Sequence, residues 1–283
     1  MTIKLDPAAA KIIAMLQNKY CLSLILLGFC IGLPIGSLAL QQGYIDRQRF
    51  DVTGVLPLAP IEGTARYELD RRIFRTTRSL QNTARWTLAV NDVQTDMAHM
   101  MSDFSCAAAI ALTPEHAPRL AALLTKASAD TDGETSMAKR HFKRLRPFQI
   151  DPGPICEPAS NVENTYDYPS GHTTLGWTWA NILAELLPKR AAQILARGRA
   201  YGESRIVCGV HNASAVEAGR TSASATLSVV RASPAYQSDF AAARQELAAL
   251  RSTSTKLNRA QCQLQSDLVA QDIFKSSPRT AAP

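Results

Sequence analysis

The stretch from Pro169 to Pro188, PSGHTTLGWTWANILAELLP, decides how the rest of the chain is interpreted. From His172 to Leu187 it is strongly apolar, and Pro188 ends the run because proline cannot continue a helix. We therefore predict an apolar helix from His172 to Leu187. A glycine and a serine stand directly before it, at the place where helix amide groups are free to bind an anion.

Elsewhere in the chain, apolar residues recur at helical spacing from Leu69 onward, and no stretch alternates as a half-buried strand would. This pattern predicts an all-α fold in a single helical domain. Further helices are expected over residues 81–109, 118–126, 189–198 and 238–250.

The N-terminus has the pattern of an export signal. An apolar run from Cys21 to Leu40 follows several lysines, and Ser37-Leu38-Ala39 ends it with small residues suited to cleavage. We expect residues 1–39 to be a signal peptide and the protein to be periplasmic or secreted. The alternative is that residues 21–40 remain as an anchor in the inner membrane, since about 20 apolar residues can span a bilayer. We expect the protein to associate with a membrane only if this segment is not cleaved.

The rest of the chain is predicted to form one domain over residues 40–252, followed by a polar, disordered tail over 253–283. Four cysteines lie beyond the apolar run, and in an exported protein they can form disulfides with three possible pairings, all of which stay open. These cysteines are Cys106, Cys156, Cys208 and Cys262. Because the sequence has neither a CxxC pair nor paired histidines at ligand spacing, we expect no zinc site.

A net charge of +7 favours an anionic partner. Nucleic acid is a poor candidate, because no long Lys/Arg block is present and no aromatic residues alternate with basic ones. Positive charge is instead concentrated at Lys139, Arg144 and Arg146, just before Pro147. By themselves these residues could equally form a solvated basic face.

Two further blocks carry chemistry that suits a phosphate. Ser170 and the Gly171 amide could donate to an oxyanion at the predicted helix start, and His172 could donate a proton there. Alternatively, Ser170 is only a helix N-cap beside an incidental histidine. Arg205, in Ser204-Arg205, has a planar guanidinium group suited to phosphate, and it precedes His211 by a short interval.

The three blocks occur in an order and at separations that resemble the signature of the phosphatidic-acid-phosphatase type 2 superfamily. They resemble most closely its bacterial class A non-specific acid phosphatases. The resemblance covers roughly Leu56 to Leu250 and includes stretches outside the three blocks. Examples are Phe104-Ser105-Cys106, Gly176-Trp177, residues 194–199, residues 207–211 and residues 217–220.

This resemblance implies a helical bundle of the phosphatidic-acid-phosphatase type 2 and vanadium-haloperoxidase type. It implies that His211 is the nucleophile that accepts the phosphoryl group of a phosphate monoester, and that His172 is the general acid. The residues implied to hold the phosphoryl oxygens are Lys139, Arg146, Ser170, Gly171 and Arg205. No cofactor or metal is implied, and the protein could form homo-oligomers.

One residue departs from the family pattern. Four positions after His211 the family carries an aspartate that orients the nucleophilic histidine, and here the residue is Ala215. Glu217 would lie on another face of a helix, and Ser214 could accept only a weaker hydrogen bond. We therefore expect reduced phosphatase activity. The alternatives are a non-catalytic protein that binds phosphate or a phosphorylated ligand, and a vanadate-dependent haloperoxidase, for which the chain is short.

Overall fold

The computed structural model describes residues 43–46, 50–253 and 257–275. The expected signal peptide or anchor, residues 1–39, lies outside the described residues. Within them the fold is helical and contains no strand, so the predicted all-α fold is confirmed. None of the helices in these described ranges is both long and apolar enough to cross a bilayer.

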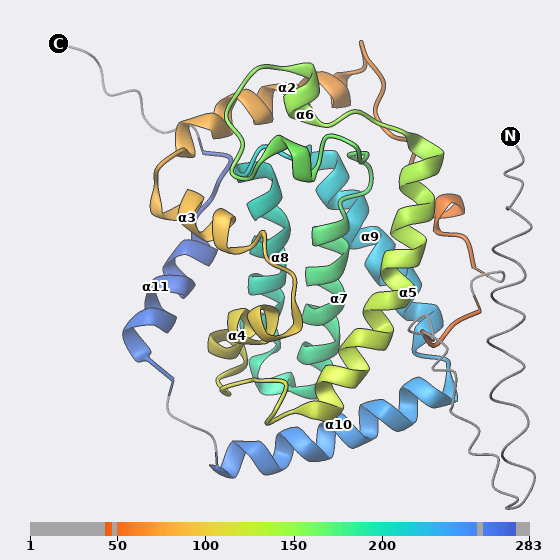
Figure 1. Cartoon of the computed structure of the whole chain (residues 1–283), viewed down its shortest axis with the longest axis vertical. Helices are drawn as coiled ribbons and strands as arrows, with labels where there is room; N and C mark the ends of the chain where they lie inside the picture. The colour runs from red at the N-terminus through yellow and green to blue at the C-terminus, as the bar shows by residue number, and fades with distance from the viewer. Residues whose placement is uncertain (1–42, 47–49, 254–256, 276–283) are drawn as a thin grey trace, which may run out of the picture. The chain divides into compact units, whose positions relative to one another are not determined.

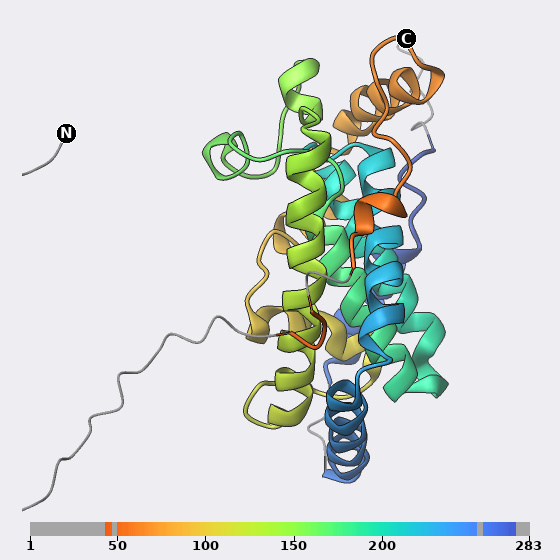
Figure 2. The ribbon, with the colours of Figure 1, turned by 90° about the vertical axis from the view of Figure 1, so that its right-hand side faces the viewer.

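The predicted apolar helix packs with three others in a group of four (Figure 1). These are α5 (Pro118–Phe142), α7 (Gly171–Leu186), α8 (Ala191–Val207) and α9 (Ala213–Val230). Helix α7 contacts α5, α8 and α9, and Figure 2 shows α5 and α9 running side by side. The predicted helix at 172–187 therefore forms within one residue of its expected ends and lies at the centre of the fold.

The remaining helices surround this group. They are α2 (Ala65–Thr77), α3 (Ala84–Asn91), α4 (Met97–Ala108), α6 (Pro147–Ile150), α10 (Pro234–Thr253) and α11 (Arg259–Ala270). Short 3₁₀ turns lie at Val52–Gly54, Arg78–Leu80, Ala159–Asn161 and Pro188–Arg190.

Helices α7 and α8 approach closely because glycine occupies their contact. A Cβ atom on Gly198 would lie 2.3 Å from the Cβ of Ala180, and one on Gly176 would lie 2.5 Å from the ring of Tyr201. Both distances are shorter than any ordinary carbon contact. The two glycines thus allow the N-terminal half of α7 to lie directly against the helix that carries Arg205.

The prediction of one helix over 81–109 was wrong in its continuity. The chain forms α3 and α4 instead. The two helices are separated because the side chains of Asp92 and Asp96, which lie between them, make hydrogen bonds of their own. Asp92 is buried and accepts hydrogen bonds from Arg197, with the shorter at 2.7 Å. Asp96 caps α4 by accepting from the amide of His99.

Helix α5 is much longer than the predicted 118–126, because its C-terminal half buries hydroxyl groups rather than apolar side chains. Thr178 donates to Thr131 at 3.2 Å, and Thr135 donates to Thr174 at 3.1 Å. All four threonines are buried. Apolar periodicity therefore disappears from the sequence while the helix continues. The helix predicted at 189–198 likewise runs on to Val207, and the one at 238–250 forms within α10.

The predicted polar tail over 253–283 contains helix α11, so that part of the prediction was also wrong. A disulfide joins Cys262 on α11 to Cys106 on α4, across 156 residues of sequence. Within α11, Val269 is buried. A second disulfide joins Cys156 to Cys208. Of the three pairings that the sequence left open, the structure contains the pairing 106–262 with 156–208.

Removing the disulfide of α11 should lower stability without changing catalysis. A Cys106→Ser/Cys262→Ser variant should lose about 2 to 5 kcal/mol of unfolding free energy, because the long loop it closes is released in the unfolded chain. Thermal denaturation should therefore give a lower Tm. Turnover at saturating substrate should be unchanged, because neither cysteine lines the pocket described below. An unchanged Tm would show that α11 is held by its noncovalent contacts alone.

Candidate active site

A pocket of about 380 Å³ lies where the C-terminal end of α5 meets the N-terminal end of α7. Five of the seven predicted site residues line it, namely Lys139, Arg146, Gly171, His172 and His211. Ser170 and Arg205 are buried next to residues that line it. The three sequence blocks, which are far apart in the chain, therefore meet at one place.

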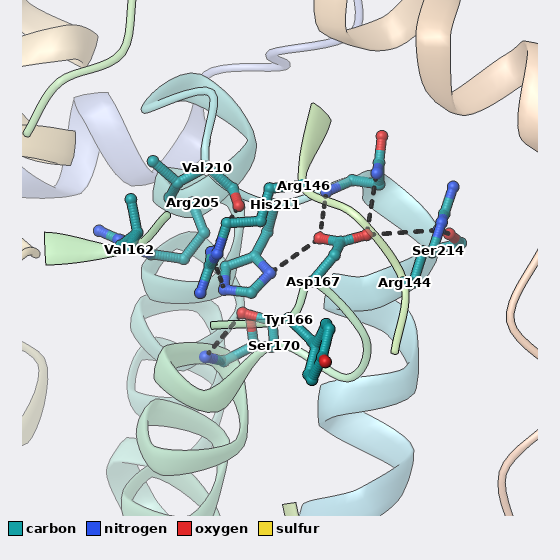
Figure 3. Close-up of polar contacts among 12 residues, drawn as sticks. Arg144, Arg146, Val162, Tyr166, Asp167, Ser170, Arg205, Val210, His211 and Ser214 are labelled. Atoms are coloured by element: carbon teal, nitrogen blue, oxygen red, sulfur yellow. Dashed lines mark hydrogen bonds and ion pairs between the residues drawn. The ribbon is translucent and has the colours of Figure 1, made fainter. Parts of the chain in front are cut away.

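His211 lies at the end of the turn that connects α8 to α9, and its ring is fixed at both nitrogens (Figure 3). Nδ1 lies 2.9 Å from Oδ1 of Asp167. Because a carboxylate only accepts, Nδ1 carries the hydrogen. Nη1 of Arg146 lies 3.1 Å from Nε2 and can only donate, so Nε2 presents its lone pair. This is the tautomer that a nucleophilic Nε2 requires.

The imidazole of His211 is also kept neutral. Burial, reinforced by Arg146, Lys139 and Arg205, lowers the pKa of His211 well below its ordinary value. A neutral ring can attack phosphorus, whereas an imidazolium cannot.

Lys139 and Arg146 supply positive charge at the pocket wall. Burial, followed by the charge of Arg146, lowers the pKa of Lys139 to about 7. Burial also lowers the pKa of Arg146 to about 10, so that its guanidinium stays charged at neutral pH. The ammonium of Lys139 donates to the carbonyl of Tyr166, and Arg146 donates to Thr165 and to the carbonyl of Val210. These bonds hold both cations toward His211.

Arg205 is 1% exposed and pairs with Glu157 through one nitrogen. Within the described part of the chain, its Nε and Nη1 are buried and make no hydrogen bond. Buried guanidinium nitrogens without an acceptor are costly, and a phosphate oxygen is a suitable acceptor for them.

The end of α8 holds Arg205 in place through several contacts. Arg78 donates to the carbonyls of Ile206 and Val207 at 2.8 Å each, and the Cys156–Cys208 disulfide ties the next residue to the segment that carries Glu157. Gly209 then turns the chain with φ +81°, a left-handed conformation that favours glycine. This turn allows the amide of His211 to reach the carbonyl of Arg205.

Ser170 and Gly171 occupy the start of α7, as predicted. Ser170 is the N-cap residue, and its Oγ accepts from the amide of Thr173 at 3.4 Å and from Oγ1 of Thr173 at 2.9 Å. The N-cap interpretation of Ser170 is therefore correct, and the residue nevertheless lies at the site. Its amide donates to the carbonyl of Ala215, which joins this loop to the turn of His211.

His172 has one nitrogen committed to the backbone. Its Nε2 lies 3.0 Å from the carbonyl of Val93, which can only accept, so Nε2 carries a hydrogen and Nδ1 is left for proton exchange. Burial, followed by Arg205, Arg146 and Lys139, lowers the pKa of His172 to about 3. An anion bound among these cations would raise that pKa by offsetting their charge.

Two carboxylates at the site, Asp167 and Glu157, were not among the residues predicted from the sequence. Asp167 stands two residues before Pro169 and could have been noticed as an acid adjoining the block. Glu157 follows Cys156, and its role depends on a disulfide that sequence spacing could not assign. Among the described residues, no group of three histidine, cysteine, aspartate or glutamate side chains is arranged to hold a metal ion.

Comparison with known proteins agrees with this geometry. The family model described as "PAP2 superfamily" matches residues 119–238. An acid phosphatase of Zymomonas mobilis is 38% identical over 197 residues, which are 69% of this chain and 75% of that protein. A non-specific acid phosphatase of Providencia stuartii is 32% identical over 73% of this chain and 84% of that protein. A non-specific acid phosphatase of Salmonella typhimurium is 31% identical over 68% of this chain and 78% of that protein.

The chain therefore belongs to the PAP2 superfamily, among its acid phosphatases. It is a phosphatase, a phosphoric monoester hydrolase.

The lowered pKa of Lys139 predicts that kcat/KM falls as pH rises through about 7, because the ammonium that attracts phosphate loses its charge there. A Lys139→Arg variant should move this decline to higher pH, since a guanidinium stays protonated. A Lys139→Gln variant should have a low kcat/KM with no inflection near 7. The measurement is kcat/KM for p-nitrophenyl phosphate from pH 5 to pH 9.

The second ionisation of the substrate also affects these profiles, but it acts equally on all three proteins. The difference between the profiles therefore isolates Lys139. An inflection that stays at the same pH in both variants would assign it to another group.

Proposed function

We propose that this protein hydrolyses phosphate monoesters in two steps through a phosphohistidine at His211. The observation that carries the proposal is that Nε2 of His211 faces Arg146 and the ring lies in the field of Lys139 and Arg205 as well, while Nδ1 is held by a carboxylate. Phosphoryl transfer depends mainly on positioning and on neutralising the charge of the phosphoryl oxygens, and this arrangement supplies both.

In the first step, Nε2 attacks phosphorus and the bond to the ester oxygen breaks. Lys139, Arg146 and Arg205 neutralise the phosphoryl oxygens, together with the Gly171 amide and Ser170. Binding of the anionic substrate offsets the charge of the cations, so Nδ1 of His172 takes up a proton from solvent. This proton passes to the leaving oxygen, which departs as an alcohol. With these cations and amides in place, we expect the reaction to need no metal or other cofactor.

In the second step, His172 takes a proton from a water molecule that attacks the phosphohistidine. The bond between Nε2 and phosphorus breaks, and inorganic phosphate leaves. His172 is thereby protonated again, and His211 returns to its neutral form. The imidazole of the phosphohistidine is a good leaving group, so two steps through this intermediate are easier than one direct displacement of the alcohol by water.

The expected loss of activity rested on the premise that His211 lacks a charged acceptor. Asp167 Oδ1 lies 2.9 Å from Nδ1, so Ala215 by itself is no reason to expect a loss. The non-catalytic alternative rested on the same premise, and no separate observation favours it. The reduced phosphatase activity expected from Ala215 stays a prediction.

The phosphohistidine can be tested directly. A His211→Ala variant should lose hydrolysis of p-nitrophenyl phosphate almost entirely, because no other group provides the nucleophile. Rapid quenching of the parent with ³²P-labelled substrate should trap label that is stable to base and lost in acid, as a phosphoramidate is. A His172→Ala variant should retain labelling best with substrates whose leaving group needs no proton. Full activity of His211→Ala would contradict the proposal.

We also propose that the protein is exported to the periplasm or secreted, with residues 1–39 removed. Two disulfides in the described domain are typical of proteins that fold in an oxidising compartment.

Fractionation of cells expressing the full chain should therefore recover the protein outside the cytoplasm, with an N-terminus near Leu40. Recovery in the membrane fraction with an intact N-terminus would favour the anchor over 21–40, and recovery in the cytoplasm would contradict export.

A further inference from the structure

Asp167 is the most completely bonded carboxylate at the site. It is 0% exposed, and its Oδ1 accepts from Nδ1 of His211 and from the amide of Asn212, at 2.9 and 3.1 Å. Its Oδ2 accepts from Nδ2 of Asn212 at 2.8 Å and faces Nη1 of Arg144 at 3.4 Å. Both oxygens are therefore fixed, and Oδ1 has its defined place beside the imidazole (Figure 3).

The charge of Asp167 is balanced by Arg144, which is itself anchored. Arg144 is 7% exposed and pairs with the buried Asp70 at 2.9 Å. Its other terminal nitrogen donates to Oγ of Ser214 at 2.6 Å. Asp70 also accepts from the amide of Ser214 at 3.0 Å, so this chain of contacts is tied to the first turn of α9. Burial raises the pKa of Asp167, and the charge of Arg144 and the hydrogen bonds from Asn212 counteract that rise and support the carboxylate form.

Position 215 is built for packing rather than for an acceptor. Ala215 is 0% exposed and belongs to an apolar cluster with Val52, Leu56, Ala138 and Tyr168. Tyr168 directly follows Asp167, so the small side chain of Ala215 makes room for the segment that carries the carboxylate. An aspartate at 215 would place a second charge among apolar groups, and its burial would be unfavourable.

We propose that Asp167 is the positioning residue that orients His211, and that it replaces in space the carboxylate missing from position 215. This proposal rests on the proposed function, in which His211 is the nucleophile. Asp167 selects the tautomer with a bare Nε2 and stabilises the positive charge that the ring gains when it bonds to phosphorus. The carboxylate comes from the loop before α7 instead of from α9.

The test measures kcat and KM for p-nitrophenyl phosphate in Asp167→Asn. Because the carboxylate charge acts on the transition state more than on bound substrate, kcat should fall by about 10² to 10⁴, with KM much less affected. Ala215→Asp should not raise kcat and should have a lower Tm. Glu217→Gln is the matched control, since Glu217 is an exposed carboxylate on α9 that pairs with Arg66, and its kcat should be unchanged.

Nitrogen NMR of the parent protein reports the tautomer of His211 in the unaltered site. The resonances of His211, assigned by their loss in His211→Ala, should show a protonated Nδ1 and a bare Nε2. In a folded Asp167→Asn, the Nδ1–H proton should move upfield as its charged acceptor is lost. A protonated Nε2 in the parent would overturn the proposal.

The kinetic outcomes separate this proposal from the proposed function. If His211→Ala is inactive while Asp167→Asn keeps the kcat of the parent, the phosphohistidine mechanism stands and Asp167 is not the orienting residue. A gain in kcat in Ala215→Asp would also overturn the proposal, because position 215 would then be the effective place for the carboxylate. If His211→Ala remains active, both proposals fail together.

Discussion

The concentration of buried positive charge around one imidazole is the constraint on which the rest of the site depends. Lys139, Arg146 and Arg205 repel one another, and each is desolvated or buried. The protein holds them by giving each a specific oxygen partner, from Tyr166, Thr165 and Glu157 respectively. Burial, reinforced by this charge, lowers the pKa of both histidines and keeps their rings neutral. In the proposed mechanism, a bound phosphate offsets this repulsion.

Much of this site could be predicted from the sequence because its residues lie in short local patterns. A glycine before an apolar helix indicates an anion-binding helix start, and the helix formed within one residue of its expected ends. Two of the basic residues before Pro147, Lys139 and Arg146, line the same pocket as His211, the histidine after Arg205. Their types and local spacing left a solvated basic face and a simple N-cap open, and the resemblance to the acid phosphatases joined the three blocks into one predicted site.

What could not be predicted depends on contacts between distant segments. Asp167 acts on His211 across 44 residues, and no local pattern links the two. The disulfide between Cys262 and Cys106 holds α11 to the fold. The polar sequence of α11 by itself does not predict a packed helix. The break between α3 and α4 reflects the ion pair of Asp92 with Arg197. In each case a tertiary partner overrides the local sequence pattern.

The buried threonines between α5 and α7 have a consequence for the position of Lys139 relative to α7. Apolar side chains would let two helices slide along each other, whereas hydrogen bonds between Thr135 and Thr174 and between Thr131 and Thr178 are directional. They set the axial register of α5 on α7. Lys139 lies one helical turn after Thr135. The hydrogen bonds between the threonines therefore fix the position of Lys139 along the axis of α5 relative to the first turn of α7.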